Sequence, residues 1–167
     1  TSKLKNSMVW SCPGNHDYYG SGLNNAYYDI FSFPTSGEAG GLASNTEKYY
    51  SFDYANIHVI SLDSHDENRN TGSPMLTWLE NDLAATTQEW IIVMFHHPPY
   101  SKGSHDSDDS SEERMIQMRE NVLPICESYG VDLVLSGHSH AYERSKLING
   151  HYGFSNTYDP VLHDIDG

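Results

Sequence analysis

The chain has 167 residues, of which 37% are hydrophobic and 12% aromatic, enough apolar material for one domain with a core and too much for a disordered chain. Its formal net charge of −14, from 23 acidic and 9 basic residues, argues against nucleic-acid binding, which needs clustered Lys and Arg. No run approaches the roughly 18 to 20 apolar residues of a membrane span. We therefore expect a single domain over residues 1–167 with no membrane span.

The first third of the chain predicts β structure and an exposed loop. Residues 8–12, MVWSC, predict a short strand, and the turn-forming sequence PGNHDYYGSG after it predicts a loop that presents Asn15 and His16. The segments KYYSFDY and IHVISLD are rich in aromatic and β-branched residues and are separated only by the dipeptide AN. This pattern predicts an antiparallel hairpin, with Asp63 at the end of its second strand.

The segment SPMLTWLENDLAATT predicts an amphipathic helix. Ser73 is a typical N-cap, Pro74 suits the first helical position, and leucines recur at helical spacing. The uninterrupted apolar run WIIVMF, residues 90–95, then predicts a strand that is covered on both faces. The prolines of HHPPY end that strand.

A second helix is expected over residues 112–129, with a kink or a new turn at Pro124 and with Gly130 at its end. The acidic stretch DSDDSSEE before it predicts a solvated loop and a helix cap. VDLVLS, residues 131–136, predicts another buried strand, parallel to residues 90–95, so that strand, helix and strand form a βαβ unit of an α/β fold. Ligands of such sheets bind beyond the carboxyl ends of the strands.

Histidines gather at the predicted strand ends. The chain contains 10 histidines, and several lie in the short sequences GNHD, FHHPP and GHSH. Neutral imidazole is the commonest metal ligand, and a metal site needs three or four converging donors on rigid elements. The histidines of GHSH, two residues apart, can place both rings on one side of an extended loop. Together these sequences predict a metal site.

In this order, GNHD, VMFHHPPYS and GHSHAYER resemble the later motifs of the calcineurin-like metallophosphoesterases, and the form GHSHAYER resembles the purple acid phosphatase branch. The resemblance covers most of the chain. It implies an α/β fold, a sandwich of two mixed sheets flanked by helices. It also implies two metal ions at the strand ends, iron with zinc, manganese or a second iron.

Motif matching assigns the metal ligands that the resemblance implies. Asn15, His96 and His138 would ligate the second metal, and His140 would ligate the first. We choose His96 over His97 because the family's ligand ends a VxxH pattern and is followed one residue later by proline.

The resemblance also implies residues that act on the substrate. His16 would touch the phosphate and act as the general acid that protonates the leaving alkoxide. His105, in SKGSHD, resembles a further substrate-binding histidine, with an exposed loop histidine as the alternative. Asp17 is expected to form the turn or to orient His16, and Asp63 could orient a site residue or simply cap its strand.

The implied function is that of an acid phosphatase. A metal-bound hydroxide would attack a small-molecule phosphomonoester that two ions clamp. Two alternatives stay open: a phosphodiesterase or nucleotidase with the same site, and a non-catalytic protein that keeps the fold for binding or assembly. The motifs do not fix the pocket for the leaving group, so the sequence does not separate them.

Two motifs of the family, DxG and GDxxY, would lie upstream of GNHD, and the 14 residues before Asn15 contain neither. The bridging aspartate, the aspartate of the first site and the iron-binding tyrosine are therefore missing. We expect the chain to be a fragment of a longer enzyme, incomplete at its N-terminus and, by the same comparison, at its C-terminus. This branch is usually exported, which implies a secreted or extracytoplasmic protein.

Overall fold

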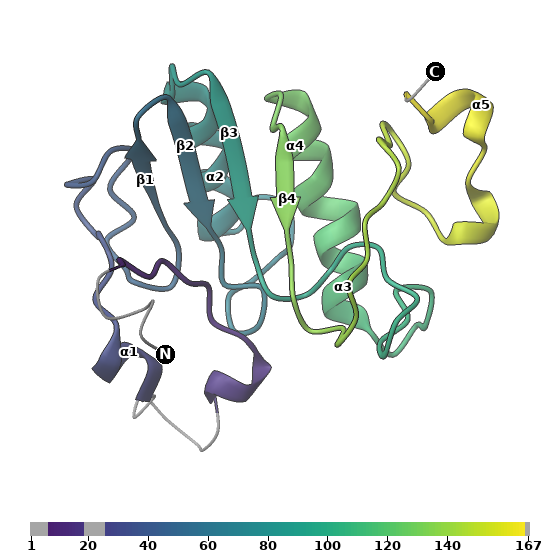
Figure 1. The fold of residues 1–167 in the computed structure, drawn as a ribbon, viewed down its shortest axis with the longest axis horizontal. Coiled ribbons are helices and arrows are strands. Elements are labelled where there is room, and N and C mark those ends of the chain that lie inside the picture. Colours follow the sequence, from purple (N-terminus) through teal and green to yellow (C-terminus); the bar gives the residue numbers. More distant parts are fainter. Residues whose placement is uncertain (1–6, 19–25, 166–167) are drawn as a thin grey trace.

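A mixed sheet of four strands, in the order β1-β2-β3-β4, forms the centre of the fold (Figure 1). The structure, a computed structural model, describes residues 7–18 and 26–165. The strands are β1 (Tyr50–Tyr54), β2 (Ile57–Ser61), β3 (Trp90–Met94) and β4 (Leu133–Leu135). β1 is antiparallel to β2, whereas β2, β3 and β4 are parallel. The expected α/β class is confirmed, and the described residues contribute one sheet.

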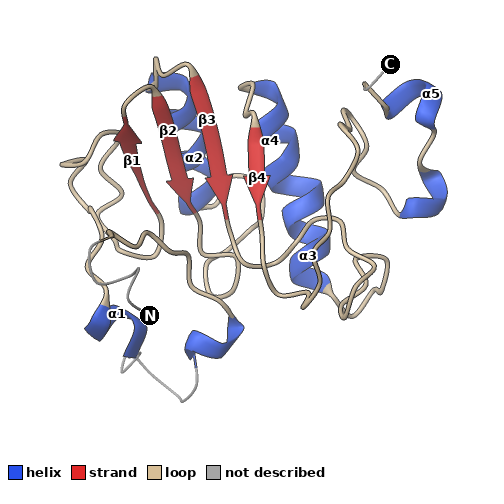
Figure 2. Ribbon diagram, viewed as in Figure 1, coloured by secondary structure: helices blue, strands red, loops and turns tan. Residues whose placement is uncertain are grey.

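The longer helices lie against one face of this sheet, behind it in Figure 2. The helices are α1 (Ala26–Ile30), α2 (Pro74–Ala85), α3 (Glu113–Gln117), α4 (Leu123–Ser128) and α5 (Pro160–His163). Apolar side chains of α2, the α3–α4 region and the sheet share one buried core, which includes Ile60, Leu79, Val93 and Val122. In the described part of the chain, no helix is both long and apolar enough to cross a membrane.

The predicted hairpin and first helix are confirmed. Tyr54 pairs with Ile57 across a two-residue turn, and Ala55 in that turn has a φ of 54°, the left-handed conformation that tight hairpins need. α2 begins as expected, because the Ser73 side chain accepts a hydrogen bond from the backbone N–H of Leu76.

The second predicted helix is present but changes its winding. A π-helical turn, Met118–Val122, joins α3 to α4, and Pro124 lies in the first turn of α4. Proline has no N–H and its ring crowds the carbonyl one turn earlier, so the wider turn relieves that clash. The same turn carries Arg119 into the interior, where its side chain is 1% exposed. Gly130 ends the helix with a φ of 72°.

Residues 8–12 do not form a strand, and this prediction is wrong. Side-chain contacts hold the segment instead of ladder hydrogen bonds: the Trp10 ring stacks on Phe52 with 4.1 Å between centroids. The carbonyl of Ser11 accepts hydrogen bonds from the hydroxyls of Tyr27 and Tyr50, at 2.9 and 2.7 Å. The segment therefore lies over the face of the sheet opposite the longer helices, beside α1.

The expectation that residues 90–95 and 131–136 are buried on both faces is also wrong for the described residues. In β3 the side chains alternate, with Ile91 and Val93 buried and Trp90 49% exposed. In β4 Leu133 and Leu135 are 46% and 49% exposed. The reason is that the longer helices cover one face, whereas α1 and Trp10 cover only part of the other, and an apolar run does not reveal how far a second layer extends.

A buried charged group fastens α2 to the hairpin. The fully buried ring of His58 lies between two carboxylates, with Nδ1 2.7 Å from Asp53 Oδ1 and Nε2 2.9 Å from Asp82 Oδ2. Asp82 also accepts hydrogen bonds from the backbone N–H of Leu42 and from the Ser51 hydroxyl. Burial alone would lower the pKa of His58, but the hydrogen bonds and charges of Asp82 and Asp53 outweigh it and raise that pKa.

The His58→Gln substitution is expected to lower the free energy of unfolding by about 3 kcal/mol at pH 6, because it leaves the buried Asp82 carboxylate without its cation. The folded-state pKa of His58 lies above its ordinary value of 6.5. Its stabilisation is therefore full below pH 6.5 and is lost as the pH rises through the folded-state pKa. Urea unfolding from pH 6 to pH 9 measures this, with His140→Gln as the exposed-histidine control. Equal stability of wild type and His58→Gln at pH 6 would contradict the prediction.

Candidate metal centre

Three loops bring nitrogen and oxygen donors together at the carboxyl edge of the sheet. Asn15 lies on a 3-10 turn (Asn15–Tyr18), His96 follows β3 and His138 follows β4. The Oδ1 atom of Asn15 is 2.8 Å from His96 Nε2, and His96 Nε2 is 3.1 Å from His138 Nδ1. The structure thus places these three predicted ligands side by side.

The spacing of these atoms fits a metal ion. Two ligands about 2.1 Å from one ion lie about 3.0 Å apart at the right angle of octahedral coordination and about 3.4 Å apart at a tetrahedral angle. The distances of 2.8 and 3.1 Å are closer to the octahedral spacing. Two imidazole nitrogens and an amide oxygen form a borderline-hard donor set that suits zinc, iron or manganese. The donor set therefore fits one ion of the family's centre.

Burial keeps the rings of this cluster neutral. It lowers the pKa of His96 to about 4, with a smaller contribution from the neighbouring charge of His138. Burial, then the charges of His138 and His96, lowers the pKa of His97 to about 2. The pKa of His138 is lowered by burial and then by His105. Neutral rings keep a lone pair on one nitrogen, which metal binding requires.

The backbone around the cluster is shaped for close approach. His138 has a φ of 63°, a left-handed conformation that is uncommon for a residue with a Cβ and is often found at functional sites. Gly14 packs so tightly on His96 that an added Cβ would come within 2.6 Å of the ring. The backbone N–H of Gly137 donates to the carbonyl of His96 at 3.0 Å, which ties the two histidine loops together.

His105 lies next to the cluster, as the resemblance implies. Its ring stacks on that of His138, with 3.8 Å between centroids. Its Nδ1 is 2.6 Å from Oε1 of Glu112, whose Oε2 is 3.8 Å from His138 Nε2. Sequence reasoning missed Glu112, because it assigned the acidic stretch to solvent and helix capping. The available signal was the position of Glu112 at the start of α3, seven residues after His105.

The remaining predicted residues lie at the rim. His16 is exposed on its 3-10 turn, close enough for its charge to lower the pKa of His96. The His140 side chain is exposed, and its backbone N–H donates to Ser104 Oγ at 2.8 Å. Among the described residues, the groups close enough to share an ion are His96, His97 and His138, and His105, Glu112 and His138. His140 is thus outside the cluster as the structure describes it.

The two aspartates considered for orienting roles both accept hydrogen bonds from nearby backbone N–H groups, and Asp63 also binds the turn that carries Asn15. Asp17 Oδ2 accepts a hydrogen bond from the N–H of Gly14 at 2.8 Å, which closes the turn that presents Asn15. Asp63 Oδ1 accepts from the N–H groups of His65 and Asp66, at 2.8 and 3.0 Å. Asp17 therefore forms the turn. Asp63 caps the end of β2 with one oxygen, and its other oxygen accepts a hydrogen bond from the hydroxyl of Tyr18, the last residue of the turn that carries Asn15 and His16.

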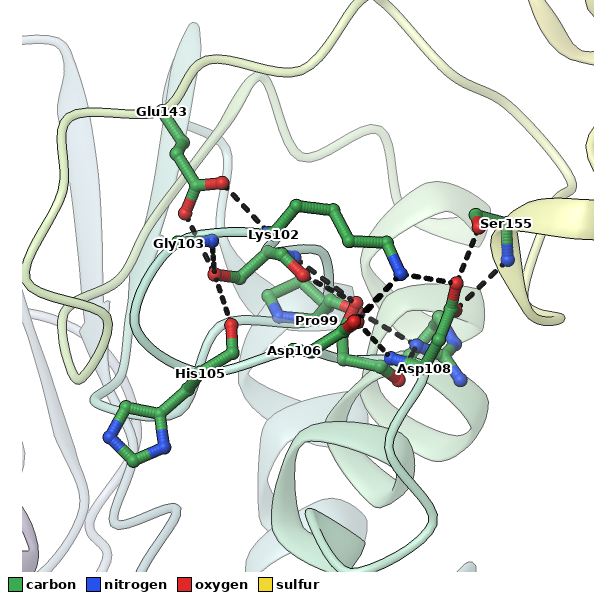
Figure 3. A network of polar contacts seen from close by, with 11 residues as sticks. Pro99, Lys102, Gly103, His105, Asp106, Asp108, Glu143 and Ser155 are labelled. Carbon is green, nitrogen blue, oxygen red and sulfur yellow. Dashed lines mark hydrogen bonds and ion pairs between the residues drawn. The ribbon is translucent and has the colours of Figure 1, made fainter.

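The loop that carries His105 is fastened to the loop that carries His138 by Glu143. This carboxylate accepts hydrogen bonds from Ser101 Oγ at 2.7 Å and from the backbone N–H of Lys102 at 2.8 Å (Figure 3). Ser101 Oγ also lies 2.8 Å from the carbonyl of His105, so the single hydroxyl proton is shared between that carbonyl and Glu143. The position of His105 therefore depends on a residue beyond the GHSH motif.

A buried arginine holds the other side of the same loop. Arg119 Nη1 donates to the carbonyls of Pro99 and Ser107, at 3.2 and 2.8 Å, and its Nε donates to the carbonyl of Tyr152 at 3.1 Å. The π-helical turn that relieves Pro124 places the guanidinium at this point. Residues 99–107 are thus fixed between the helix and the C-terminal segment.

The fold and the donor set define an α/β protein with a metal-binding edge. A profile of the calcineurin-like phosphoesterases matches residues 2–142. The chain belongs to the calcineurin-like phosphoesterase family, whose members hydrolyse phosphate esters with metal ions.

The relatives point to one branch of that family. The chain is 34% identical to purple acid phosphatase 23 of Arabidopsis thaliana over 166 residues, which is 96% of this chain and 32% of the relative. It is 38% identical to purple acid phosphatase 18 of the same plant over 121 residues, 71% of this chain and 26% of the relative. The chain thus spans about a third or less of the length of these relatives.

A solved structure supports the fold. The purple acid phosphatase PPD1 from yellow lupin (Lupinus luteus) seeds matches with a TM-score of 0.55 and 24% identity, over 75% of this chain and 22% of that chain. At this identity the likeness shows the fold.

The Gly14→Ala substitution is expected to reduce Zn²⁺ affinity at least tenfold, because the new methyl group would displace the His96 ring. Isothermal titration calorimetry on purified protein measures the affinity. Gly137→Ala is the matched control, since its Cβ would come no closer than 3.4 Å to the same ring. Wild-type affinity in Gly14→Ala would contradict the prediction.

The Glu143→Ala substitution is expected to speed amide hydrogen exchange in residues 99–108, because the Ser101 hydroxyl and the Lys102 N–H lose their common acceptor. Exchange in α2 and β3 is expected to stay unchanged. Mass spectrometry of peptic fragments gives both values, and Glu120→Ala, at an exposed position of the neighbouring helical segment, is the control. Unchanged exchange in the loop would show that Glu143 does not hold it.

Proposed function

We propose that the chain forms part of a metal-dependent phosphatase that hydrolyses phosphomonoesters at a binuclear centre. The observation that carries this proposal is the convergence of Asn15, His96 and His138 within hydrogen-bonding distance at the carboxyl edge of the sheet. The family and its purple acid phosphatase relatives support the same reaction class. The branch to which these relatives belong also leads us to propose a secreted or extracytoplasmic protein.

Asn15, His96 and His138 would hold one ion, and His140 would contribute to the other, with iron beside zinc, manganese or a second iron. These ions would supply Lewis-acid activation of the ester and of the attacking water. Of the proposed ligands of the first metal, the described residues include His140, and the carboxylates that the family uses there would come from other parts of the protein. The activity is therefore proposed for the protein at its natural length.

His16 and His105 would act on the substrate itself. His16, on an exposed turn beside the ligand Asn15, would donate a proton to the leaving oxygen. Glu112 accepts the proton on His105 Nδ1 and holds the ring against His138. His105 would then face the phosphate with its other ring nitrogen, Nε2. Both groups lie on the solvent side of the cluster, where a phosphate ester can enter.

The His138→Ala substitution is expected to lower hydrolysis of p-nitrophenyl phosphate at least a thousandfold and to remove about one metal ion per chain, since it deletes a ligand at the centre of the cluster. Steady-state kinetics and elemental mass spectrometry measure these two effects in the protein at its natural length. His163→Ala, in α5, is the control for removal of an imidazole elsewhere.

The same assay separates the alternatives. Faster hydrolysis of bis(p-nitrophenyl) phosphate than of the monoester would favour a phosphodiesterase. Metal-loaded wild-type protein that hydrolyses neither ester would overturn the proposed function and leave a binding protein with the same fold.

A further inference from the structure

A second histidine lies inside the candidate centre without an assigned role. The ring centroid of His97 is 4.9 Å from that of His96 and 4.5 Å from that of His138. Its side chain is 3% exposed and lines the same shallow cavity as Asn15 and His105. Distance alone would allow His97 to be a further metal ligand.

The fully buried hydroxyl of Ser64 decides which nitrogen of His97 carries the proton. Ser64 Oγ accepts a hydrogen bond from the backbone N–H of His97 at 2.9 Å and lies 2.9 Å from His97 Nδ1. Over residues 7–18 and 26–165, Ser64 Oγ has no other hydrogen-bond partner, so Nδ1 is the one acceptor for its proton. The opposite tautomer would bury an unpaired hydroxyl hydrogen, at a cost of about 1–3 kcal/mol.

The tautomer determines what His97 can do. With Nδ1 accepting from Ser64, the neutral ring carries its proton on Nε2, and a protonated nitrogen cannot bind a metal ion. Ser64 is not part of the cavity wall, so the opposite edge of the ring is the one that can face the cavity. In the described residues, no polar group forms a hydrogen bond with His97 Nε2.

We propose that His97 is a substrate-binding residue whose Nε2–H donates a hydrogen bond to a phosphate oxygen held at the candidate metal centre, and that Ser64 is its positioning residue. This inference rests on the proposed function, because it takes the ligand to be a phosphate ester or the phosphate released from it. It also separates the two adjacent histidines: His96 offers a lone pair, and His97 offers a proton.

The test compares His97→Leu, which removes the donor, with His97→Gln, which restores an amide N–H near the position of Nε2. In the metal-loaded protein at its natural length, His97→Leu is expected to bind inorganic phosphate about tenfold more weakly, with an unchanged metal content. His97→Gln is expected to recover most of that affinity. Isothermal titration calorimetry with inorganic phosphate and elemental mass spectrometry supply the two measurements.

Nitrogen-15 NMR of the His97 ring gives a readout that does not depend on the His97 variants folding. The wild type is expected to show the proton on Nε2, and Ser64→Ala is expected to shift the ring towards the other tautomer. A wild-type proton on Nδ1 would overturn the proposal. So would the loss of one metal ion per chain in both His97 variants, or wild-type phosphate affinity in His97→Leu.

These experiments distinguish a failure of the proposed function from a failure of the inference about His97. If the wild type binds phosphate through His97 but hydrolyses no ester, the proposed function fails and the inference stands. If the wild type hydrolyses phosphomonoesters and His97→Leu retains full phosphate affinity, the inference fails and the proposed function stands.

Discussion

The parallel pairing of β2, β3 and β4 is the constraint on which the candidate centre depends. Because the carboxyl ends of parallel strands meet at one edge, the residues after β3 and β4 must lie close together, and those after β2 join them. The hydrogen bond from Gly137 to the carbonyl of His96 continues that pairing beyond the strands. Reversal of β4 would send His138 to the opposite edge of the sheet. The order and direction of the strands therefore bring the metal-binding positions together, and the side chains at those positions then supply the ligand atoms.

The cluster costs stability, which other contacts offset. Burial of several imidazoles removes them from water, and His138 adopts a left-handed conformation. The compensating interactions lie elsewhere: the carboxylates around His58 fasten α2 to the hairpin, and Arg119 fixes the loop after His97. The contacts that stabilise the fold are thus made by residues other than the candidate metal ligands.

Local patterns predicted the hairpin and α2, because each depends on residues close together in sequence. The alternation of strand and helix predicted the βαβ unit, and its parallel strands predicted the edge where the histidines gather. The strand at residues 8–12 and the full burial of the later strands were wrong, since both depend on whether another layer covers the sheet. Motif resemblance supplied Asn15, His96, His138 and His105. It could not supply the roles of Ser64 and Arg119. Ser64 contacts His97, and Arg119 contacts Tyr152, in each case a residue 33 positions further along the chain. Such contacts exist only once the chain has folded.

The two nitrogens of His138 connect the two halves of the candidate site. Nδ1 faces His96 at 3.1 Å, and Nε2 lies 3.8 Å from Glu112, the carboxylate that also binds His105. A ligand histidine usually directs its outer nitrogen towards a carboxylate, which fixes the ring and raises its basicity. Glu112 is therefore shared between a candidate metal ligand and a candidate substrate-binding residue. The start of α3 sets the orientation of both rings, so the metal-binding and substrate-binding halves of the site are not independent of each other.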